Sequence, residues 1–511
     1  MERTPEDLVE ENTLTLHEIE YNKGVAEIQN FKGKYPKQLW YLFLAEMWER
    51  FSFYGMRGML IIFMTEKLLI VEKDANLKYG AIQAFAYAMT FVGGLFADKI
   101  LGFRRSIFWG GTLMIIGSFI LAFSPEHLFY IGISFTIVGT GFFKPNISTM
   151  AGTLYKAGDP RRDAGFSLFY SGINIGALAG GYFCIRAADL YSWNLAFSLA
   201  GICMVFGLGT FIFTQKSLGP IGLSPLSPKL PKIRKNISEI AVYAGSVLVI
   251  PLIILLVKHE SYTDLFMYIA GPLTLLYIFW EMRLFSWVEN KKLIAALILI
   301  TFSIFFWAFF EQSGGSLALF ARHNLHKHLL GIEMDPNGIN NSSNSVFVIV
   351  FSPLIGLIWL WMNKRKFEPN TVVKFGLGFL FLSLAFYVFF YTRFFADAQG
   401  MTSLNIFTLA YFVITLGELC LSPIGLSIMT KLSPKPLQGV MMGLWFLASA
   451  YGQYAAGIFG SEMTTSGNAS LLDKLMAYTE GYKQLAIYAF IAGIVMILLS
   501  PLIRKLMQDV K

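Results

Sequence analysis

The chain has 511 residues, of which 55% are hydrophobic and only 14% are charged, and its mean hydropathy is +0.55. Because soluble domains are roughly 45–50% apolar and about 25% charged, this composition excludes an ordinary soluble protein and indicates a membrane protein. The net charge of +8 is explained by basic loops on the cytoplasmic side of such a protein, so it predicts no nucleic-acid partner.

The first 38 residues are polar and of mixed charge, without the basic region and apolar stretch of a secretory signal. We therefore expect residues 1–38 to form a cytoplasmic tail. A run of roughly 18–25 apolar residues is needed to cross a bilayer as a helix, and the rest of the chain contains about fourteen such runs. They lie near 40–64, 79–101, 106–123, 128–150, 164–187, 194–214, 238–257, 263–287, 293–321, 345–363, 373–392, 404–430, 438–463 and 484–503.

These runs form groups of six, two and six, and a segment rich in Pro, Ser and Lys (215–236) follows the first group as a linker. The sequence thus predicts an all-α polytopic membrane protein. A six-helix bundle at 39–214 is followed by the linker and two additional transmembrane helices at 215–292. A second six-helix bundle with a short cytoplasmic tail follows at 293–511. The loops that are cytoplasmic in this arrangement hold most of the Lys and Arg, so we expect both termini in the cytoplasm.

The first apolar run carries several charges, in "EMWERFSFYGMR" (46–57). On a helix, Glu46, Glu49, Arg50, Tyr54 and Arg57 fall within about 140° of one another and form a polar stripe. A charge at the centre of a bilayer costs about 2.5–3.5 kcal/mol, so this stripe must face a water-filled cavity or partners on other helices. The alternative is a salt-bridge cluster that only holds helices together.

Other apolar runs supply partners for this stripe. These are Lys144, Asn174, Glu311, Asn344 and Glu418, with Tyr87 as a further candidate. A buried pair that loses one member leaves an uncompensated charge, which costs about 3–5 kcal/mol. Protonation of one carboxylate would therefore decide which pairs are stable, and such a set can work as a proton-operated gate. Two alternatives remain open: Tyr87 only packs, and Asn344, beside the loop-like "DPNGINNSSN", only caps a helix.

The six histidines lie in the tail, in loops or at the ends of runs, so a proton relay would use carboxylates whose pKa values Lys and Arg tune. The three cysteines lie in apolar runs and predict neither a disulfide framework nor a metal site, and we expect no cofactor. The sequence contains no H-E-x-x-H, G-x-S-x-G or P-loop motif. This argues against a membrane enzyme and excludes an ATP-driven pump.

Several motifs resemble those of the proton-dependent oligopeptide transporter family, within the major facilitator superfamily. "EMWERFSFYGMR" resembles the family's E-x-x-E-R-F-x-x-Y motif, "GFFKPNIS" its K-P-N segment, and "FYSGINIGAL" its F-Y-x-x-I-N-x-G motif. "GGLFADKILGFRR" resembles the superfamily's loop signature, and "FFEQSGGSLALFA" and "GELCLSPIGLS" resemble two later helices. The motifs run from about residue 46 to beyond 445 in the family's order.

This resemblance implies the major facilitator fold, with two six-helix bundles around a central cavity and the additional helix pair of prokaryotic members. It also implies proton-coupled symport of di- and tripeptides into the cell across the cytoplasmic membrane, by alternating access. The residues implied to couple protons are Glu46, Glu49, Arg50, Lys144, Arg57 and Glu311, the last two as a pair in the external gate.

The resemblance likewise implies a peptide-binding site with opposite charges at its two ends. The residues concerned are Arg50, Tyr54, Arg57, Tyr87, Lys144, Asn174, Trp307, Asn344, Glu418 and Trp445. Within this set, the basic side chains would face the peptide carboxylate, and the two asparagines and Glu418 would face its amino group. The four aromatic residues would line side-chain pockets.

The expected partners are therefore peptides, protons and the lipid bilayer, and a monomer is the working expectation. The first alternative is the same fold with another small substrate, such as nitrate or a peptide-like compound. The second alternative is a membrane sensor that does not transport.

Overall fold

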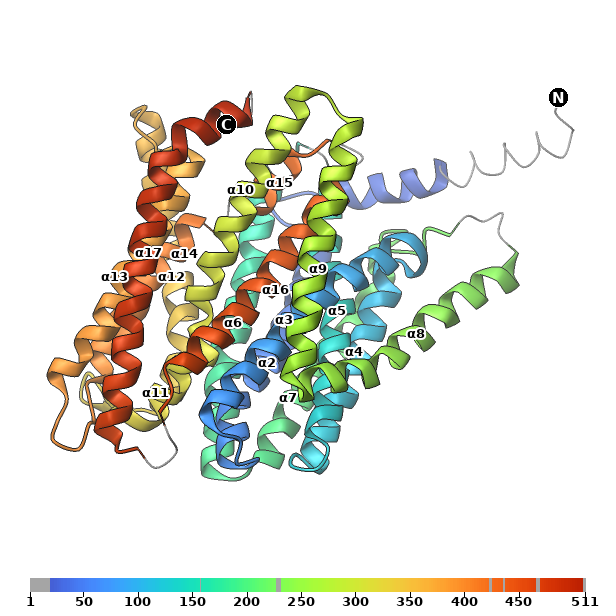
Figure 1. The fold of residues 1–511 in the computed structure, drawn as a ribbon. Coiled ribbons are helices and arrows are strands. Elements are labelled where there is room, and N and C mark those ends of the chain that lie inside the picture. The colour runs from blue at the N-terminus through green and yellow to red at the C-terminus, as the bar shows by residue number, and fades with distance from the viewer. Residues whose placement is uncertain are drawn as a thin grey trace, which may run out of the picture. The chain divides into compact units, whose positions relative to one another are not determined.

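A computed structural model describes residues 19–156, 158–226, 231–421, 425–434, 437–465 and 469–508. Residues 1–18 of the expected tail and 227–230 of the expected linker lie outside the described residues. Long helices joined by short connections make up the described chain (Figure 1). A two-stranded antiparallel sheet, β1 (His328–Leu329) with β2 (Ile332–Glu333), lies between two of them.

The helices follow the order expected from the apolar runs. The first group is α2 (Lys37–Glu66), α3 (Glu72–Phe96), α4 (Phe103–Phe123), α5 (Phe129–Thr153), α6 (Arg161–Leu190) and α7 (Trp193–Thr214). The middle pair is α8 (Lys232–Lys258) and α9 (Glu260–Glu281). The last group is α10 (Trp287–Phe310), α11 (Ser316–Asn324), α12 (Pro336–Lys364), α13 (Thr371–Tyr391), α14 (Leu404–Leu421), α15 (Gly425–Leu432), α16 (Gln438–Glu462) and α17 (Leu471–Met507). Short helical turns are η1 (Ala97–Leu101), η2 (Gln215–Leu218), η3 (Met282–Leu284), η4 (Glu311–Gly314) and η5 (Thr392–Phe395).

Among the described residues, every expected apolar run coincides with a helix or with successive helices, and residues 422–424 of the run 404–430 lie outside the described residues. Within the described chain, 11 helical stretches are long and apolar enough to cross a membrane. The helices α2, α5 and α16 fall short of that measure, so the number fourteen stays a prediction. The expected run 293–321 is divided into α10, η4 and α11, because the chain turns at Gly314 and Gly315, which have no side chain to favour a helix.

Polar caps set the starts of several helices. Ser286 and Glu289 form a capping box at the start of α10, and Ser470 and Asp473 form one at the start of α17. The start of α17 therefore precedes the expected apolar run, since the capped first turns are polar. Asp335 caps α12 by accepting a hydrogen bond from the Gly338 backbone N–H.

Glycine determines how closely α4 and α5 pack. A methyl group at Gly110 would lie 2.6 Å from the carbonyl oxygen of Gly139. One at Gly117 would lie 2.5 Å from the carbonyl oxygen of Gly132. Because neither position carries a side chain, the two backbones approach each other directly, as is usual where membrane helices pack.

The helices belong to two compact units that do not follow chain order. Unit 1 contains the residues up to Phe53, Met89–Gly176 and Phe197–Ile254. Unit 2 contains Tyr54–Ala88, Ala177–Ala196 and Leu255–Lys511. The helices α2, α3, α6, α7 and α8 therefore contribute one part to each unit. The domain limits expected from the sequence follow chain order and stay predictions.

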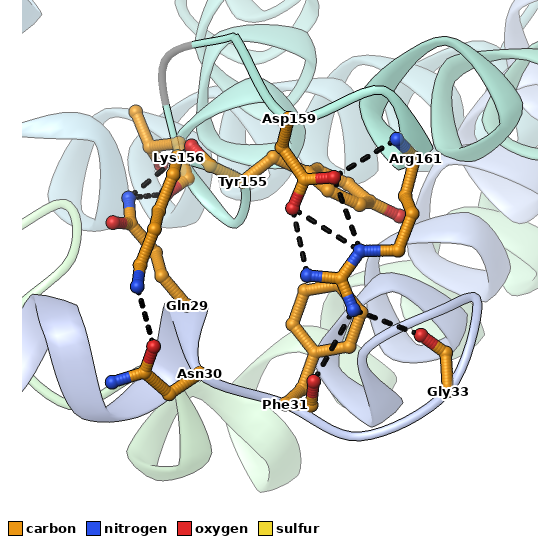
Figure 2. A network of polar contacts seen from close by, with 9 residues as sticks. Gln29, Asn30, Phe31, Gly33, Tyr155, Lys156, Asp159 and Arg161 are labelled. Carbon is orange, nitrogen blue, oxygen red and sulfur yellow. Dashed lines mark hydrogen bonds and ion pairs between the residues drawn. The ribbon is translucent and has the colours of Figure 1, made fainter.

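Within unit 1, a polar network holds the segment before α2 against the connection between α5 and α6 (Figure 2). Gln29 Nε2 donates a hydrogen bond to the Tyr155 carbonyl oxygen at 3.2 Å. Arg161 forms an ion pair with Asp159 at 2.7 Å, and its guanidinium carbon lies 4.1 Å from the ring centroid of Phe31. Hydrogen bonds from Arg161 lower the pKa of Asp159. The segment before α2 is thus fixed to unit 1 by charge, hydrogen bonds and stacking.

Candidate functional site

The polar stripe of α2 begins in unit 1 with two acids that share one guanidinium. Arg50 Nε lies 3.0 Å from Glu46 Oε1 and also forms an ion pair with Glu49. These three residues are at most 1% exposed. Lys144 on α5 lies close enough to interact electrostatically with both acids, and its Nζ lies 5.8 Å from the ring centroid of Phe53. Two acids and two bases are therefore grouped inside the protein, where an uncompensated charge would be costly.

Helix α6 approaches this cluster so closely because it has a glycine there. A methyl group at Gly176 would lie 2.2 Å from the Met47 carbonyl oxygen and 2.9 Å from Arg50 Cβ. Asn174, also on α6, is 6% exposed and donates to the Tyr170 carbonyl oxygen at 3.0 Å. Asn174 thus lies in the same unit as the acids, on the helix that packs against them.

The stripe continues in unit 2, where the ion pair expected between Arg57 and Glu311 is present. Arg57 also donates from Nε to the Tyr79 hydroxyl at 2.7 Å and from Nη2 to Ser313 Oγ at 3.3 Å. Its guanidinium carbon lies 5.6 Å from the ring centroid of Tyr54. Glu311 is the first residue of η4, so the end of α10 presents this carboxylate to α2. Arg57 and Glu311 are 8% and 5% exposed, respectively, so the pair is buried.

A second polar group in unit 2 joins α12 to α14. Asn344 Nδ2 donates to Glu418 Oε2 at 2.8 Å and to Thr415 Oγ1 at 3.1 Å. The alternative that Asn344 caps a helix is wrong, because α12 begins at Pro336 and Asp335 is its cap. Glu418 is 8% exposed, so an amide donor is directed at a buried acid.

The remaining polar face of α12 was not predicted from the sequence. The segment "DPNGINNSSN" was interpreted as loop-like, yet from Pro336 on it is helical. Asn340 Nδ2 donates to the Ser313 carbonyl oxygen at 2.7 Å, and the Tyr411 hydroxyl donates to Asn340 Oδ1 at 2.6 Å. The signal was available: asparagines at 337, 340, 341 and 344 have the spacing of one helix face.

The aromatic candidates differ in their surroundings. Tyr87 packs against the cluster of Ala84, Met267 and Ala450 and also lies close enough to Arg57 to interact with it electrostatically, so its role stays a prediction. The indole Nε1 of Trp307 is buried, and among the described residues no hydrogen-bond acceptor lies within reach of it. Trp445 on α16 is 7% exposed. Trp307 thus has a buried N–H donor without an acceptor among the described residues, and its role in peptide binding stays a prediction.

The predicted site residues are therefore distributed over the two units. Unit 1 contains Glu46, Glu49, Arg50, Lys144 and Asn174, and unit 2 contains Tyr54, Arg57, Tyr87, Trp307, Glu311, Asn344, Glu418 and Trp445. Tyr79, which the sequence analysis did not single out, belongs to the second set through its contact with Arg57. A single cavity lined by both sets stays a prediction.

The chain resembles known proteins along most of its length. Residues 104–478 match the PTR2 family, described as the POT family. The chain is 35% identical to the peptide transporter YePEPT of Yersinia enterocolitica, and the alignment covers 93% of this chain and 96% of the relative. It is 33% identical to the uncharacterized transporter YclF of Bacillus subtilis, over 96% of this chain and 99% of the relative. It is 29% identical to dipeptide and tripeptide permease B of Xenorhabdus bovienii, over 93% and 97%.

Solved structures agree with these relatives. A crystal structure of the peptide transporter POT in complex with sulfate aligns with a TM-score of 0.83 at 31% identity, covering 96% of this chain and 99% of that one. A variant of the peptide transporter POT in complex with alafosfalin aligns equally well, with the same TM-score, identity and coverage. Family match, sequence identity and fold therefore coincide over nearly the whole chain. The chain belongs to the POT family and is a multi-pass membrane protein with the major facilitator fold.

Proposed function

We propose that this protein is a proton-coupled symporter that imports di- and tripeptides across the cytoplasmic membrane by alternating access. The observation that carries the proposal is the buried group of Glu46, Glu49, Arg50 and Lys144, in a chain whose relatives are named peptide transporters and permeases. Both termini face the cytoplasm in this proposal, as the basic loops indicate.

A short peptide is a zwitterion, so a site that binds it needs a positive group for one end and a negative group for the other. Its carboxylate requires positive charge, which Arg50, Lys144 and Arg57 can supply. Its ammonium group requires an acid, and Glu418 with the amide of Asn344 beside it provides one. The side chains of peptides vary, so an apolar lining with few polar groups suits them.

Proton coupling follows from the two carboxylates that share Arg50. With both acids ionised, the two negative charges balance Arg50 and Lys144. A proton on Glu49 would neutralise one acid and leave one positive charge in excess, which a peptide carboxylate can compensate. Proton and peptide would then bind cooperatively, because each lowers the electrostatic cost of the other.

The energy available is sufficient for accumulation. One proton that crosses 100 mV supplies about 2.3 kcal/mol. A pH difference of one unit adds about 1.4 kcal/mol. Together these sustain a peptide gradient of some hundreds-fold, since each 1.4 kcal/mol corresponds to a factor of about ten.

The test is uptake of labelled dialanine into proteoliposomes under an inward proton gradient, which an ionophore then collapses. We expect accumulation that disappears with the gradient. Glu49→Gln should abolish accumulation while retaining exchange of labelled for unlabelled peptide, because exchange moves no net proton. Glu480→Gln is the matched control, since Glu480 pairs with Arg393 and Lys483, neither of which is a predicted site residue.

The absence of both accumulation and exchange in folded, reconstituted protein would refute the peptide proposal. Uptake of another small solute, such as nitrate, would then identify the same machinery with a different substrate. Binding of peptides without uptake would instead identify a sensor.

A further inference from the structure

A charged cleft lies at one end of unit 2, between the connection from α12 to α13 and the last turns of α17 (Figure 1). Its volume is about 960 Å³. The charged residues of its described lining are Lys366, Glu368, Lys374, Arg504 and Lys505. We call it the basic cleft. It contains none of the predicted site residues, so it is a separate feature of the molecule.

Hydrogen bonds of Asn370 hold the walls of the basic cleft together. Its Oδ1 accepts from the backbone N–H groups of Val372 and Val373 at 3.0 and 3.1 Å, which caps the start of α13. The same oxygen accepts from Ser500 Oγ on α17 at 3.2 Å. One side chain therefore ties α17 to the start of α13, and the cleft is a built part of the fold rather than a gap between loose ends.

Positive charge is in excess in the basic cleft. Hydrogen bonds from Lys374 and Asn363 lower the pKa of Glu368, so this carboxylate is ionised and balances Lys374. Among the described residues, three lining side chains form no ion pair, namely Lys366, Arg504 and Lys505. All three are exposed, so their charges are accessible to an anion from outside the protein.

Two tryptophans place the basic cleft at the level of the lipid headgroups. Trp359 and Trp361 lie in the last turns of α12. Lys374 Nζ lies 4.6 Å from the ring centroid of Trp359, and the guanidinium carbon of Arg365 lies 4.7 Å from that of Trp361. Tryptophan is enriched at the boundary between bilayer and water, where its ring is in contact with apolar chains and its neighbours are wet. The cleft beside these rings therefore opens at the membrane surface.

The helices that lead to the basic cleft are apolar on their exposed side. On α12 these exposed residues include Leu357 and Leu360, and on α17 they include Leu498 and Leu502, each more than half exposed. In a membrane-spanning helix such side chains contact the hydrocarbon chains of lipid. A soluble anion would contact only the basic residues, whereas a phospholipid can place its phosphate in the cleft and its acyl chains along the leucines.

We propose that the basic cleft binds the headgroup of an anionic phospholipid of the cytoplasmic leaflet, with its phosphate held by Lys366, Arg504 and Lys505. Basic pockets between membrane helices on the cytoplasmic side suit such headgroups. The guanidinium of Arg504 can donate two parallel hydrogen bonds to a phosphate, and the two ammonium groups add point charges. This inference goes beyond the proposed function and uses the proposed orientation only to name the leaflet.

The experiment measures lipid binding at this position in the purified full chain. A fluorophore on Leu502→Cys is titrated with phosphatidylglycerol or phosphatidylcholine whose acyl chains are brominated and quench it on contact. The three native cysteines are buried, so the label reports position 502. Phosphatidylglycerol should quench at concentrations at least tenfold lower than phosphatidylcholine. Arg504→Gln with Lys505→Gln should weaken the phosphatidylglycerol effect about thirtyfold, the factor for about 2 kcal/mol, because each basic residue near an anionic lipid surface contributes about 1 kcal/mol.

Arg283→Gln with Lys291→Gln is the matched control. It removes the same charge from two bases that also lie over tryptophan rings, at 5.4 and 5.6 Å, but do not line the cleft, so the affinity for phosphatidylglycerol should not change. Lys366→Gln alone should weaken binding about fivefold, which keeps the proposal testable if the variant with both Arg504 and Lys505 replaced folds poorly.

Three outcomes would overturn the proposal. They are equal quenching by the two lipids, equal phosphatidylglycerol affinity in the cleft variants and the control variant, and displacement of phosphatidylglycerol by inorganic phosphate at matched ionic strength. The last outcome would identify a site for free phosphate instead of lipid. Because no peptide and no proton gradient are present, each outcome is distinguishable from a failure of peptide uptake.

Discussion

The contact between Tyr79 and Arg57 allows a sharp prediction about how the buried arginine is held. Arg57 has three polar partners, and Tyr79 is the one that accepts from Nε, at 2.7 Å. Tyr79 is 2% exposed, so water does not replace the hydroxyl easily. Tyr79→Phe keeps the ring and removes only the acceptor.

The expected cost follows from the charge on the donor. Hydrogen bonds to charged groups contribute about 1.5–3 kcal/mol, whereas a neutral pair contributes about 0.5–1.5 kcal/mol. Tyr411→Phe is the matched control, because Tyr411 is also 2% exposed and donates to the neutral side chain of Asn340 at 2.6 Å. Tyr79→Phe should therefore destabilise the protein more than Tyr411→Phe, by about 1–1.5 kcal/mol.

Thermal unfolding of the two purified variants, in one detergent and at one pH, checks this order. The apparent melting temperature should fall in both, and further in Tyr79→Phe. Glu311→Gln combined with Tyr79→Phe should be less than additive, since both changes act on Arg57. Equal melting temperatures for the two tyrosine variants would refute the reasoning that Tyr79 holds a charged group.

Three further predictions concern other parts of the chain. Asn344→Ala should raise the KM for dialanine uptake several-fold and destabilise the protein by about 1–3 kcal/mol, because the buried Glu418 loses its amide donor, and uptake kinetics and thermal unfolding measure the two effects. Burial raises the pKa of the Asp335 carboxyl, so the folded state favours its protonated form. The contribution of this carboxyl to the free energy of unfolding is therefore present at low pH and is lost as the pH rises through the raised pKa. Asp335→Asn should therefore gain in melting temperature relative to the parent from pH 4 to pH 7, and a constant difference would contradict this sign. Arg161→Ala removes the contacts of Arg161 with Phe31, so protease should cleave the segment around Phe31 faster in this variant than in the control variant Arg162→Ala. Mass spectrometry of the cleavage products measures the difference.

The sequence predicted the helices well because membrane helices leave a long apolar signal. In the part of the chain that the structure describes, each apolar run coincides with helix, and the pairing of Arg57 with Glu311 is present. These features depend on local composition and on family motifs, both of which are visible in the sequence itself. The site as a functional unit stays a proposal.

The polar parts were harder to predict, for physical reasons. The start of α12 was interpreted as loop-like because Asn, Ser and Gly favour turns when considered alone. It is a helix because partners distant in sequence, such as the Ser313 carbonyl and the Tyr411 hydroxyl, satisfy its asparagines. Tyr79 was missed for the same reason, since a tyrosine near a helix start shows no sign of its partner 22 residues earlier.

The glycines of α2 and α6 have a consequence for movement. In unit 1 the Gly176 position touches the backbone of Met47, and in unit 2 the Gly55 position lies so close to Cys184 that a methyl group would be 2.5 Å from its sulfur. The two helices thus touch on both sides of the unit boundary that each of them crosses. Neither helix can bend alone without opening a gap or a clash along this line of contact. We therefore expect α2 and α6 to bend together when either of them bends.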